Sequence, residues 1–318
     1  MAAEARTSDR AEPRGSGVIG AALGAALLFA LPYLVPLVAV FAWPIAPFPL
    51  IVHRMSRGLP SAVMAALLAA SFLAWLVTPA VAFEFLAVLV LPGLLIAEGL
   101  ARGRGLRRGA AWAFFALAFE IAAMLLVAGP QMTSAVLDPL NALRSPQFLS
   151  ELRTQLPQEN VDAFAEQATT LYNVMEVVYP AALLIMGALV VLANAALLRL
   201  YLARRDPGWL EGGEFEGLRF SILLPVLFVM GGLFVVFPPL RAAGYNLVLL
   251  AGFFFAVQGL AVVTYYASRL AGPTFLRAGL LLLVLLNPWA PQILALLGLI
   301  DIWADFRKWA DPPKAEQG

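Results

Sequence analysis

The chain has 318 residues, of which 62% are hydrophobic and only 13% charged, and its mean hydropathy is +0.85. Soluble domains are near half apolar and a quarter charged, so this composition excludes a water-soluble fold and predicts an all-α, polytopic transmembrane helical bundle. The net charge of +1 gives no reason to expect binding to nucleic acid. The absence of cysteine excludes disulfides and thiolate sites, and the one histidine, His53, cannot build a metal site alone. We therefore expect no cofactor and no metal.

The membrane segments can be found from their length, because a hydrocarbon layer of roughly 30 Å needs about 20 mostly apolar helical residues. Two stretches at the ends of the chain, 17–53 and 275–306, are interrupted by prolines, and each is interpreted as a hairpin that either spans or re-enters the membrane. We therefore expect about 8 to 10 membrane segments. The six internal ones are 61–79, 83–100, 110–128, 179–200, 220–238 and 247–268.

The basic residues predict the orientation, because cytoplasmic loops retain Lys and Arg. With hairpins at both ends, all 21 basic residues except Arg144, Arg153 and Arg241 fall on one side. This places both termini in the cytoplasm, with the protein crossing its membrane many times and the lipid bilayer as its first partner. A cleaved secretory signal in the first 46 residues is the competing interpretation, but the apolar stretch there is longer than a signal peptide needs.

This topology divides the chain into five parts. They are a cytoplasmic tail (1–16), an N-terminal membrane bundle (17–130), an acidic periplasmic insertion (131–178), a C-terminal membrane bundle (179–306) and a second cytoplasmic tail (307–318). In the insertion, Ser145 followed by Pro146 predicts a helix start, and apolar residues at helical spacing from Val161 predict a helix that runs on toward the next span. The insertion is either an interfacial helix or a lid over a substrate.

One carboxyl group lies deep in a predicted span. Glu120 is twelve residues after Arg108 and ten before Pro130, which places it roughly 15 to 18 Å from either end of its helix. Small residues share its helix face, so we expect the carboxyl group to face protein. Ionisable groups are costly in hydrocarbon, so Glu120 is either a proton- or substrate-binding group or a structural interhelical hydrogen bond.

A second candidate surface lies on the helix of 247–268. Gly252, Gly259 and Tyr266 are spaced by seven residues on one stripe, while Gln258 and Tyr265 lie on the adjacent stripe. Small residues admit a close neighbour and the amide and phenol supply hydrogen bonds, which predicts a polar patch. Tyrosines near a membrane interface are also ordinary. Glu84, Glu98 and Asp301 lie toward segment ends, where we expect water to reach them, and are weaker candidates.

The first helix carries the small-xxx-small spacing that allows close helix packing, within the chain or with a partner. Its residues are Gly20, Ala21, Gly24 and Ala25, with Ala22 and Ala26 repeating the spacing. Catalytic motifs are absent: there is no GxxxxGK[ST], no GxSxG and no pair of deep aspartates. We therefore expect no enzymatic activity.

Three segments resemble the YybS-like family of uncharacterised bacterial membrane proteins. They are Leu297-Gly-Leu-Ile-Asp-Ile-Trp-Ala-Asp-Phe-Arg307, Gln258-Gly-Leu-Ala261 and Asn194-Ala-Ala-Leu197. That family is in turn distantly similar to the substrate-binding S components of energy-coupling-factor transporters. This resemblance implies that Ala21 and Ala25, or Ala22 and Ala26, dock onto a transmembrane coupling subunit.

The sequence thus predicts an integral inner-membrane protein that binds a small solute or a lipid-like molecule, as a transport component, with Glu120, Gln258 and Tyr265 at the site. The alternative is a membrane scaffold or assembly protein without a ligand.

Overall fold

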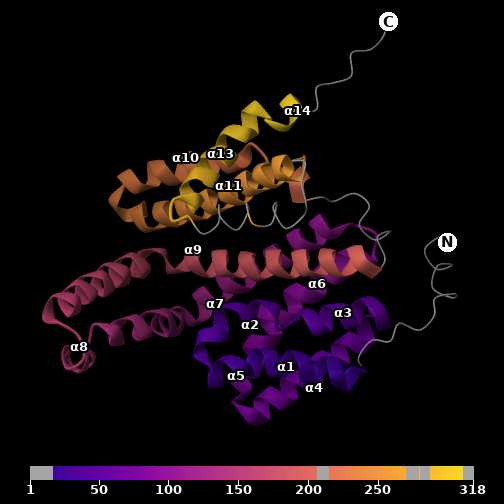
Figure 1. The fold of residues 1–318 in the computed structure, drawn as a ribbon, viewed down its shortest axis with the longest axis horizontal. Helices are drawn as coiled ribbons and strands as arrows, with labels where there is room; N and C mark the ends of the chain where they lie inside the picture. Colours follow the sequence, from indigo (N-terminus) through magenta and orange to yellow (C-terminus); the bar gives the residue numbers. More distant parts are fainter. Residues whose placement is uncertain (1–16, 206–214, 270–278, 280–286, 311–318) are drawn as a thin grey trace, which may run out of the picture. The chain divides into compact units, whose positions relative to one another are not determined.

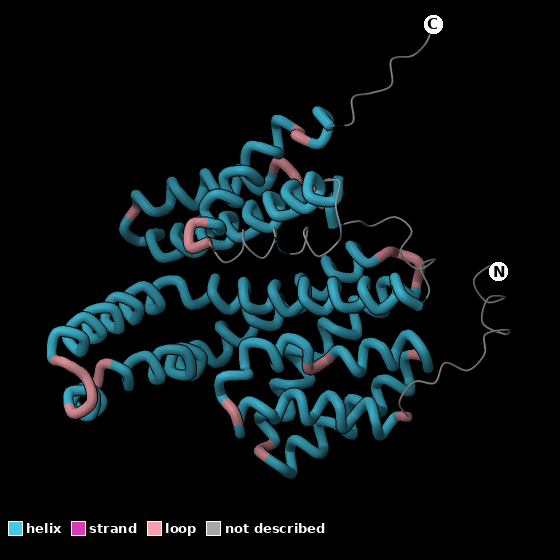
Figure 2. The backbone as a smooth tube through the Cα atoms, in the orientation of Figure 1, coloured by secondary structure: helices cyan, strands magenta, loops and turns pink. Residues whose placement is uncertain are grey.

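The computed structural model describes residues 17–205, 215–269, 279 and 287–310, and over these ranges it contains helices and turns but no strand (Figures 1 and 2). The chain forms two compact units. The first contains residues 1–120 and 186–213, and the second contains residues 121–185 and 214–318. The predicted all-α class is confirmed for the described part of the chain.

Five helical stretches in the described residues are long and apolar enough to cross a membrane: Leu59–Leu76, Pro79–Ala101, Leu106–Arg153, Gln158–Arg205 and Pro238–Arg269. Three shorter apolar helices accompany them: α1 (Val18–Leu34), α10 (Leu223–Val236) and α13 (Ala290–Ala304). The predicted spans 61–79, 83–100, 110–128, 179–200 and 247–268 are therefore confirmed as long apolar helices. The sixth internal prediction, 220–238, is only the 14-residue helix α10, which is shorter than a membrane span needs. The tail 1–16 and most of 275–286 lie outside the described residues, and the orientation of the termini stays a prediction.

The N-terminal stretch forms α1, the 3₁₀ turn η2 (Pro36–Val38), α2 (Ala39–Ile45) and α3 (Phe48–Arg57). Pro36 and Pro47 lie where the stretch breaks, because proline cannot donate the backbone hydrogen bond of a helix interior, whereas Pro32 and Pro44 lie inside α1 and α2. α1 packs on α4 (Leu59–Leu76) and α3 through buried alanines, which allow the backbones to come close (Figure 1). Trp43 Nε1 donates to Phe29 O over 3.1 Å and fixes α2 against α1.

The next span is not a regular helix. α5 (Pro79–Glu84) leads into a π-helical turn, η3 (Phe85–Val90), and then into α6 (Leu91–Ala101). Pro92, in the first turn of α6, has no backbone N–H to give to the preceding turn. The Leu91 N–H bonds to Leu86 O, five residues back, so the π turn shifts the hydrogen-bond register ahead of this proline.

The helix α7 (Leu106–Leu143) continues beyond the predicted end of its span at residue 128. It bends at Ala128, whose φ of −128° and ψ of 32° are not helical, and resumes through Pro130. Thr133 Oγ1 donates to Gly129 O over 2.9 Å, so the resumed helix bonds a carbonyl beside the bend. The span predicted to end at residue 128 therefore continues as a kinked helix, because Pro130 has no N–H to donate to the preceding turn.

The acidic insertion contains the two predicted helices. α8 (Pro146–Arg153) begins with Ser145 as its cap, whose Oγ accepts from Phe148 N over 3.3 Å. α9 (Gln158–Arg205) runs without interruption from the insertion into the following span. Both predicted helix features are confirmed.

Pro180 interrupts the hydrogen bonding of α9, and a side chain of α11 (Arg241–Arg269) bonds the backbone groups beside it. The Asn246 side chain accepts from Ala181 N over 2.8 Å and donates to Val177 O over 2.7 Å, so it bridges a backbone pair that a regular helix would bond directly.

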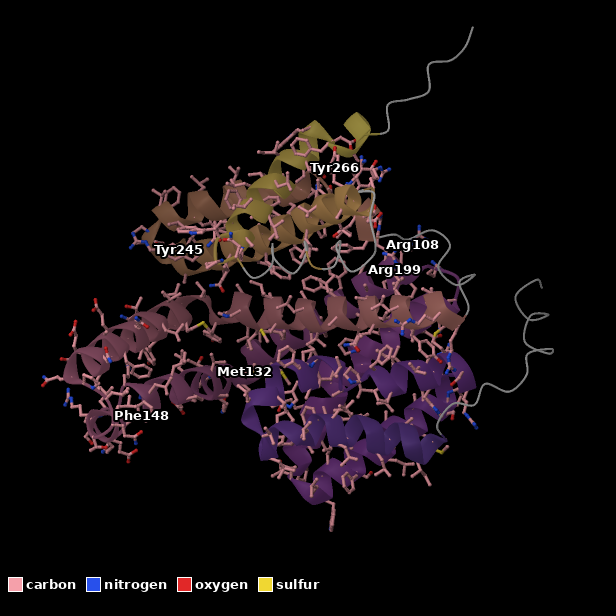
Figure 3. The ribbon with its side chains drawn as sticks, in the orientation of Figure 1. Arg108, Met132, Phe148, Arg199, Tyr245 and Tyr266 are labelled. Atoms are coloured by element: carbon pink, nitrogen blue, oxygen red, sulfur yellow. The ribbon has the colours of Figure 1, made fainter. Side chains whose placement is uncertain are left out.

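In the second unit, α11 packs against both α10 and α13 (Figure 1), and glycines lie at the closest approaches. A Cβ at Gly244 would lie 2.7 Å from Gly231 O, and a Cβ at Gly259 or Gly298 would overlap Leu294 O or Phe255 O. These helices approach until backbone meets backbone, which only glycine permits. Figure 3 shows Tyr245 and Tyr266 toward opposite ends of α11.

Candidate functional site

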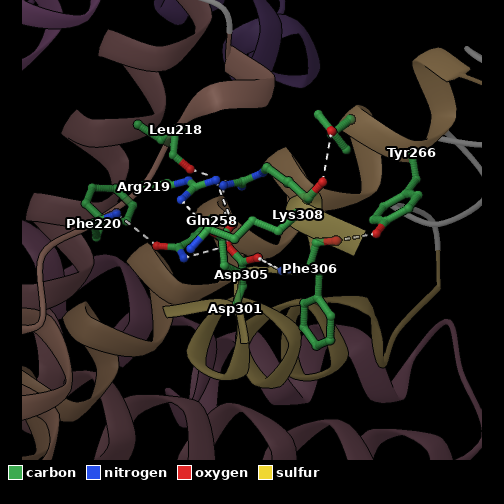
Figure 4. Close-up of polar contacts among 11 residues, drawn as sticks. Leu218, Arg219, Phe220, Gln258, Tyr266, Asp301, Asp305, Phe306 and Lys308 are labelled. Carbon is green, nitrogen blue, oxygen red and sulfur yellow. Dashed lines mark hydrogen bonds and ion pairs between the residues drawn. The ribbon is translucent and has the colours of Figure 1, made fainter. Parts of the chain in front are cut away.

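A buried polar cluster lies at the end of α13, within the second unit. We call it the Asp301 cluster and define it as Arg219, Gln258, Asp301, Asp305 and Arg307 (Figure 4). α11 contributes Gln258, and the last turn of α13 contributes Asp301. Asp305 is the C-cap of α13, and α14 (Arg307–Ala310) begins with Arg307. Arg219 comes from the segment that precedes α10.

Gln258 and Asp301 form the buried centre of this cluster, with exposed fractions of 1% and 3%. Gln258 Nε2 donates to Asp301 Oδ2 over 2.9 Å, while Gln258 Oε1 accepts from Phe220 N over 2.9 Å. Asp301 Oδ1 accepts from Phe306 N over 3.1 Å. The amide therefore joins α11 to α13 and to the segment before α10, and all its partners are polar groups that burial would otherwise leave unsatisfied.

Arg307 is a buried cation beside this pair, with an exposed fraction of 4%. Its Nη1 lies 3.4 Å from Asp301 Oδ2, and its Nη2 donates to Leu218 O over 3.1 Å. Neither Nη1 nor Nε has a hydrogen-bond acceptor among the described residues. Burial lowers the pKa of Arg307, as does the charge of nearby Arg219, while Asp301 and Asp305 act in the opposite direction.

Asp305 forms the outer edge of the cluster. It has a φ of 47°, the left-handed conformation of a helix C-cap, which aspartate tolerates better than most residues. Arg219 Nη1 donates to Asp305 Oδ2 over 2.7 Å, and Lys308 Nζ lies 3.0 Å from the same oxygen. Burial raises the pKa of Asp305, but the bonds from Lys308 and Arg219 outweigh this and leave the pKa below its ordinary value.

Two tyrosines of α11 hold the backbone of this turn. Tyr265 Oη donates to Arg307 O over 3.2 Å, and Tyr266 Oη donates to Phe306 O over 2.6 Å. Both main-chain carbonyls belong to the turn that orients the Arg307 side chain. The tyrosines therefore position the cluster through the backbone.

The structure brings together two of the three predicted site residues. Gln258 bonds to Asp301, and Tyr265 bonds to Arg307, so both reach the same turn. Glu120 belongs to the first unit, and its two carboxyl oxygens are shielded from solvent without a hydrogen-bond partner among the described residues. A common site for Glu120 and Gln258 stays a prediction.

One expectation about the ends of the segments is wrong. Asp301 was expected where water can reach it, but only 3% of the residue is exposed, because α11 and the start of α14 cover it. Glu98 also has partners: it pairs with Arg54 over 2.6 Å and with Arg102 over 2.7 Å. Sequence reasoning missed Arg219, Asp305 and Arg307 as site residues. The four-residue spacing of Asp301 and Asp305, which places both on one helix face, was the available signal.

The predicted packing residues fall into two groups. Ala21 and Ala25, like Ala22 and Ala26, are buried inside the first unit, so they serve packing within the chain; Gly20 is exposed and Gly24 lies near Pro49. Gly259 is in backbone contact with α13, whereas a Cβ at Gly252 would meet nothing within 4 Å.

In the part of the chain that the structure describes, the cavity and the metal-ligating residues do not indicate a further binding site. An apolar cavity of about 130 Å³ lies between α1 and α4, lined by Ile19, Ala22, Leu23, Leu68, Ala69 and Phe72. Sites for small molecules are usually larger, at roughly 300 Å³ or more. No group of three or more His, Asp or Glu side chains within these ranges could hold a metal ion.

Comparison with known proteins gives a family but no characterised relative. No curated protein and no solved structure matches the chain. A family model described as "Predicted membrane protein (DUF2232)" matches residues 23–302, which run from within α1 to within α13. The chain therefore belongs to the DUF2232 family of predicted membrane proteins.

Proposed function

We propose that this chain is a binding component of the bacterial inner membrane that takes a small solute or a lipid-like molecule at the Asp301 cluster and serves a transport complex. The observation that carries the proposal is a buried arginine, Arg307, whose Nε has no hydrogen-bond acceptor among the described residues, beside the buried pair Gln258 and Asp301. Buried polar groups normally have all their partners, so an under-bonded cluster is where a ligand would complete the bonding.

The proposed role is binding without catalysis. The cluster contains an amide, two carboxylates and two guanidinium groups, which recognise and orient a ligand. It contains no hydroxyl or imidazole paired for nucleophilic attack. Glu120, which belongs to the first unit, is proposed separately as a proton- or substrate-binding group.

The resemblance to YybS-like proteins and to S components of energy-coupling-factor transporters supports a transport role, with a membrane-embedded coupling subunit as partner and both termini in the cytoplasm. The burial of Ala21 and Ala25 removes the surface that this resemblance implies for docking. A coupling subunit would therefore have to contact other helices.

A scaffold role is the second candidate, and the acidic insertion favours it. None of the residues of α8 is buried, and Glu151, Glu159, Asp162 and Glu166 are all exposed. Such a surface suits contact with another envelope protein better than packing within this chain.

Ligand binding separates the two candidates. The purified wild-type protein and its Gln258→Leu and Glu120→Gln variants are screened for ligand-induced shifts of the melting temperature against a panel of vitamins and lipids. A compound that stabilises the wild type but not Gln258→Leu supports the binding role. The absence of a shift for every compound contradicts it. Co-purification with assembly proteins and without an ATPase would then support the scaffold.

A further inference from the structure

Arg307 is held firmly but is not fully bonded. Its carbonyl accepts from Tyr265, the preceding Phe306 is bonded through both its N–H and its carbonyl, and Nη2 is anchored on Leu218 O. The guanidinium group is thus fixed before any ligand arrives, while Nε has no acceptor among the described residues. A buried N–H without an acceptor costs about 1–3 kcal/mol, and more for a charged group.

The nearby carboxylates bond to other residues or reach only Nη1 of Arg307, which leaves Nε without an acceptor among the described residues. Asp301 accepts from Gln258 and from Phe306 N, and Asp305 is shared by Arg219 and Lys308. Arg219 is close enough for its charge to act on Arg307, and half of its side chain is exposed. Asp301 and Asp305 already offset part of the repulsion between the two guanidinium groups, and a bound anion would offset more of it.

The position of this pair suggests the kind of anion. Arg307 comes three residues after the end of the apolar helix α13, at the depth where a spanning helix meets the headgroup layer. Guanidinium groups bind phosphate through parallel N–H···O bonds, and a tetrahedral group has enough oxygens to bridge two of them. Basic sites at the ends of membrane helices bind lipid phosphates by this chemistry.

We propose that Arg307 and Arg219 together bind a phosphate group, carried either by the headgroup of an anionic phospholipid or by a soluble phosphate ester. The phosphate oxygens accept from Arg307 Nε and from Arg219, and Asp305 keeps its ion pair with Lys308. This assignment names the ligand chemistry of the Asp301 cluster and so rests on the binding role proposed above.

The test compares four purified proteins in an uncharged detergent: wild type, Arg307→Lys, Arg219→Gln and a control, Arg108→Lys. Lysine keeps the charge of Arg307 but lacks the Nε–H and the planar fork. Arg108 is exposed and makes no ion pair among the described residues (Figure 3). Each protein is titrated with sodium phosphate, against sodium chloride at matched ionic strength, and with phosphatidylglycerol, against diacylglycerol with the same chains. Melting temperature and native mass spectrometry report binding.

We expect phosphatidylglycerol to raise the melting temperature of the wild type and to form a one-to-one complex, and diacylglycerol to do neither. Arg307→Lys and Arg219→Gln should each weaken the apparent Kd by about tenfold or more, while Arg108→Lys binds as the wild type does. A response to phosphatidylglycerol alone assigns the lipid as the source, and an additional response to inorganic phosphate assigns a soluble ester. If Arg307→Lys does not fold, Arg219→Gln, which leaves every anchor of Arg307 in place, decides the question.

The proposal is overturned if neither probe stabilises the wild type, or if the folded variants bind phosphatidylglycerol as tightly as the control does. Binding of an uncharged compound from the ligand panel, together with failure here, would refute the phosphate site and leave the binding role standing. Failure of every compound in both experiments would refute both.

Discussion

Gln258 Nε2 donates a hydrogen bond to Asp301 Oδ2 over 2.9 Å, and the same oxygen lies 3.4 Å from Arg307 Nη1. An uncharged amide of α11 therefore orients the carboxylate that faces the buried cation. Because all three residues are at least nine-tenths buried, each depends on the others for its polar contacts. The side chain of Gln258 therefore stabilises the polar contacts at the C-terminal end of α13.

The first prediction concerns Gln258→Leu. Leucine leaves Phe220 N and one oxygen of Asp301 without their partner in a buried site, so we expect the free energy of unfolding to fall by about 1–3 kcal/mol. Thermal unfolding in detergent, followed by tryptophan fluorescence, measures the change. Gln292→Leu on an exposed position of α13 is the control and should stay within about 0.5 kcal/mol of the wild type. Equal losses in both variants would contradict the role of Gln258.

The second prediction compares two glycines of α11. Gly259→Ala places a methyl group against Leu294 O of α13, which must push the helices apart at a cost of about 1–3 kcal/mol. Gly252→Ala meets nothing within 4 Å and should be neutral, or more stable by about 0.5–1 kcal/mol, since alanine favours helix. Melting temperatures of the two variants test this directly. The close packing of α11 on α13 would be wrong if the order were reversed.

The third prediction concerns the bridge at Pro180. Asn246→Ala removes the acceptor of Ala181 N and a donor to Val177 O, so α9 should open more often at this point. We expect hydrogen exchange at Ala181 to speed up by about tenfold or more, which corresponds to the loss of about 1–3 kcal/mol for an unpaired buried group. The control is Asn173→Ala, at an exposed position of the same helix. Unchanged exchange at Ala181 would mean that Asn246 does not hold the break together.

The fourth prediction is a pH dependence. Burial alone would raise the pKa of Asp305, but Lys308 and Arg219 lower it below the ordinary aspartate value of about 3.9. A carboxyl group with a lowered pKa adds stability above the ordinary value, and this contribution is lost as the pH falls through the folded-state pKa. We therefore expect the wild type to melt at a higher temperature than Asp305→Asn near pH 7, and the difference to shrink below about pH 4. Asparagine also tolerates the left-handed backbone, so the comparison isolates the charge. A difference that is constant with pH would contradict the ion pairs.

The fifth prediction is the topology. Reporter fusions after Gly318 and within α8 should report opposite sides of the membrane, with the C-terminal fusion in the cytoplasm. Activity of a cytoplasmic reporter and of an exported reporter at each position gives the answer. Fusions that report the same side would refute the hairpins at the ends of the chain.

Hydropathy was sufficient to predict five of the six internal spans, since a span is defined by its own length and apolar content, but it made the 14-residue α10 too long. It was less successful at prolines. Hydropathy places the end of one span at residue 128, but α7 bends at Ala128 and continues through Pro130 to Leu143. The continuous α9 and the Ser145 cap follow from local sequence and were predictable for that reason.

The candidate site was predictable only in part. Gln258 and Tyr265 stand out as polar groups within an apolar helix, but their partners do not. Asp301 looks like a helix-end residue that water can reach, and Arg307 looks like one of many basic residues after a span. Their burial comes from α11 and the segment before α10, which are distant in sequence.

The sequence by itself determined that this is a membrane protein of helices and where most of its spans run, because each depends on a continuous stretch of chain and on the hydrocarbon it must cross. Only the tertiary structure decided which charges are buried and paired. That depends on helices meeting at Gly259 and Gly298, closely enough for Gln258 to reach Asp301 and for the tyrosines to hold the turn of Arg307. The free energy of a buried charge is set by these neighbours, and no local pattern contains them.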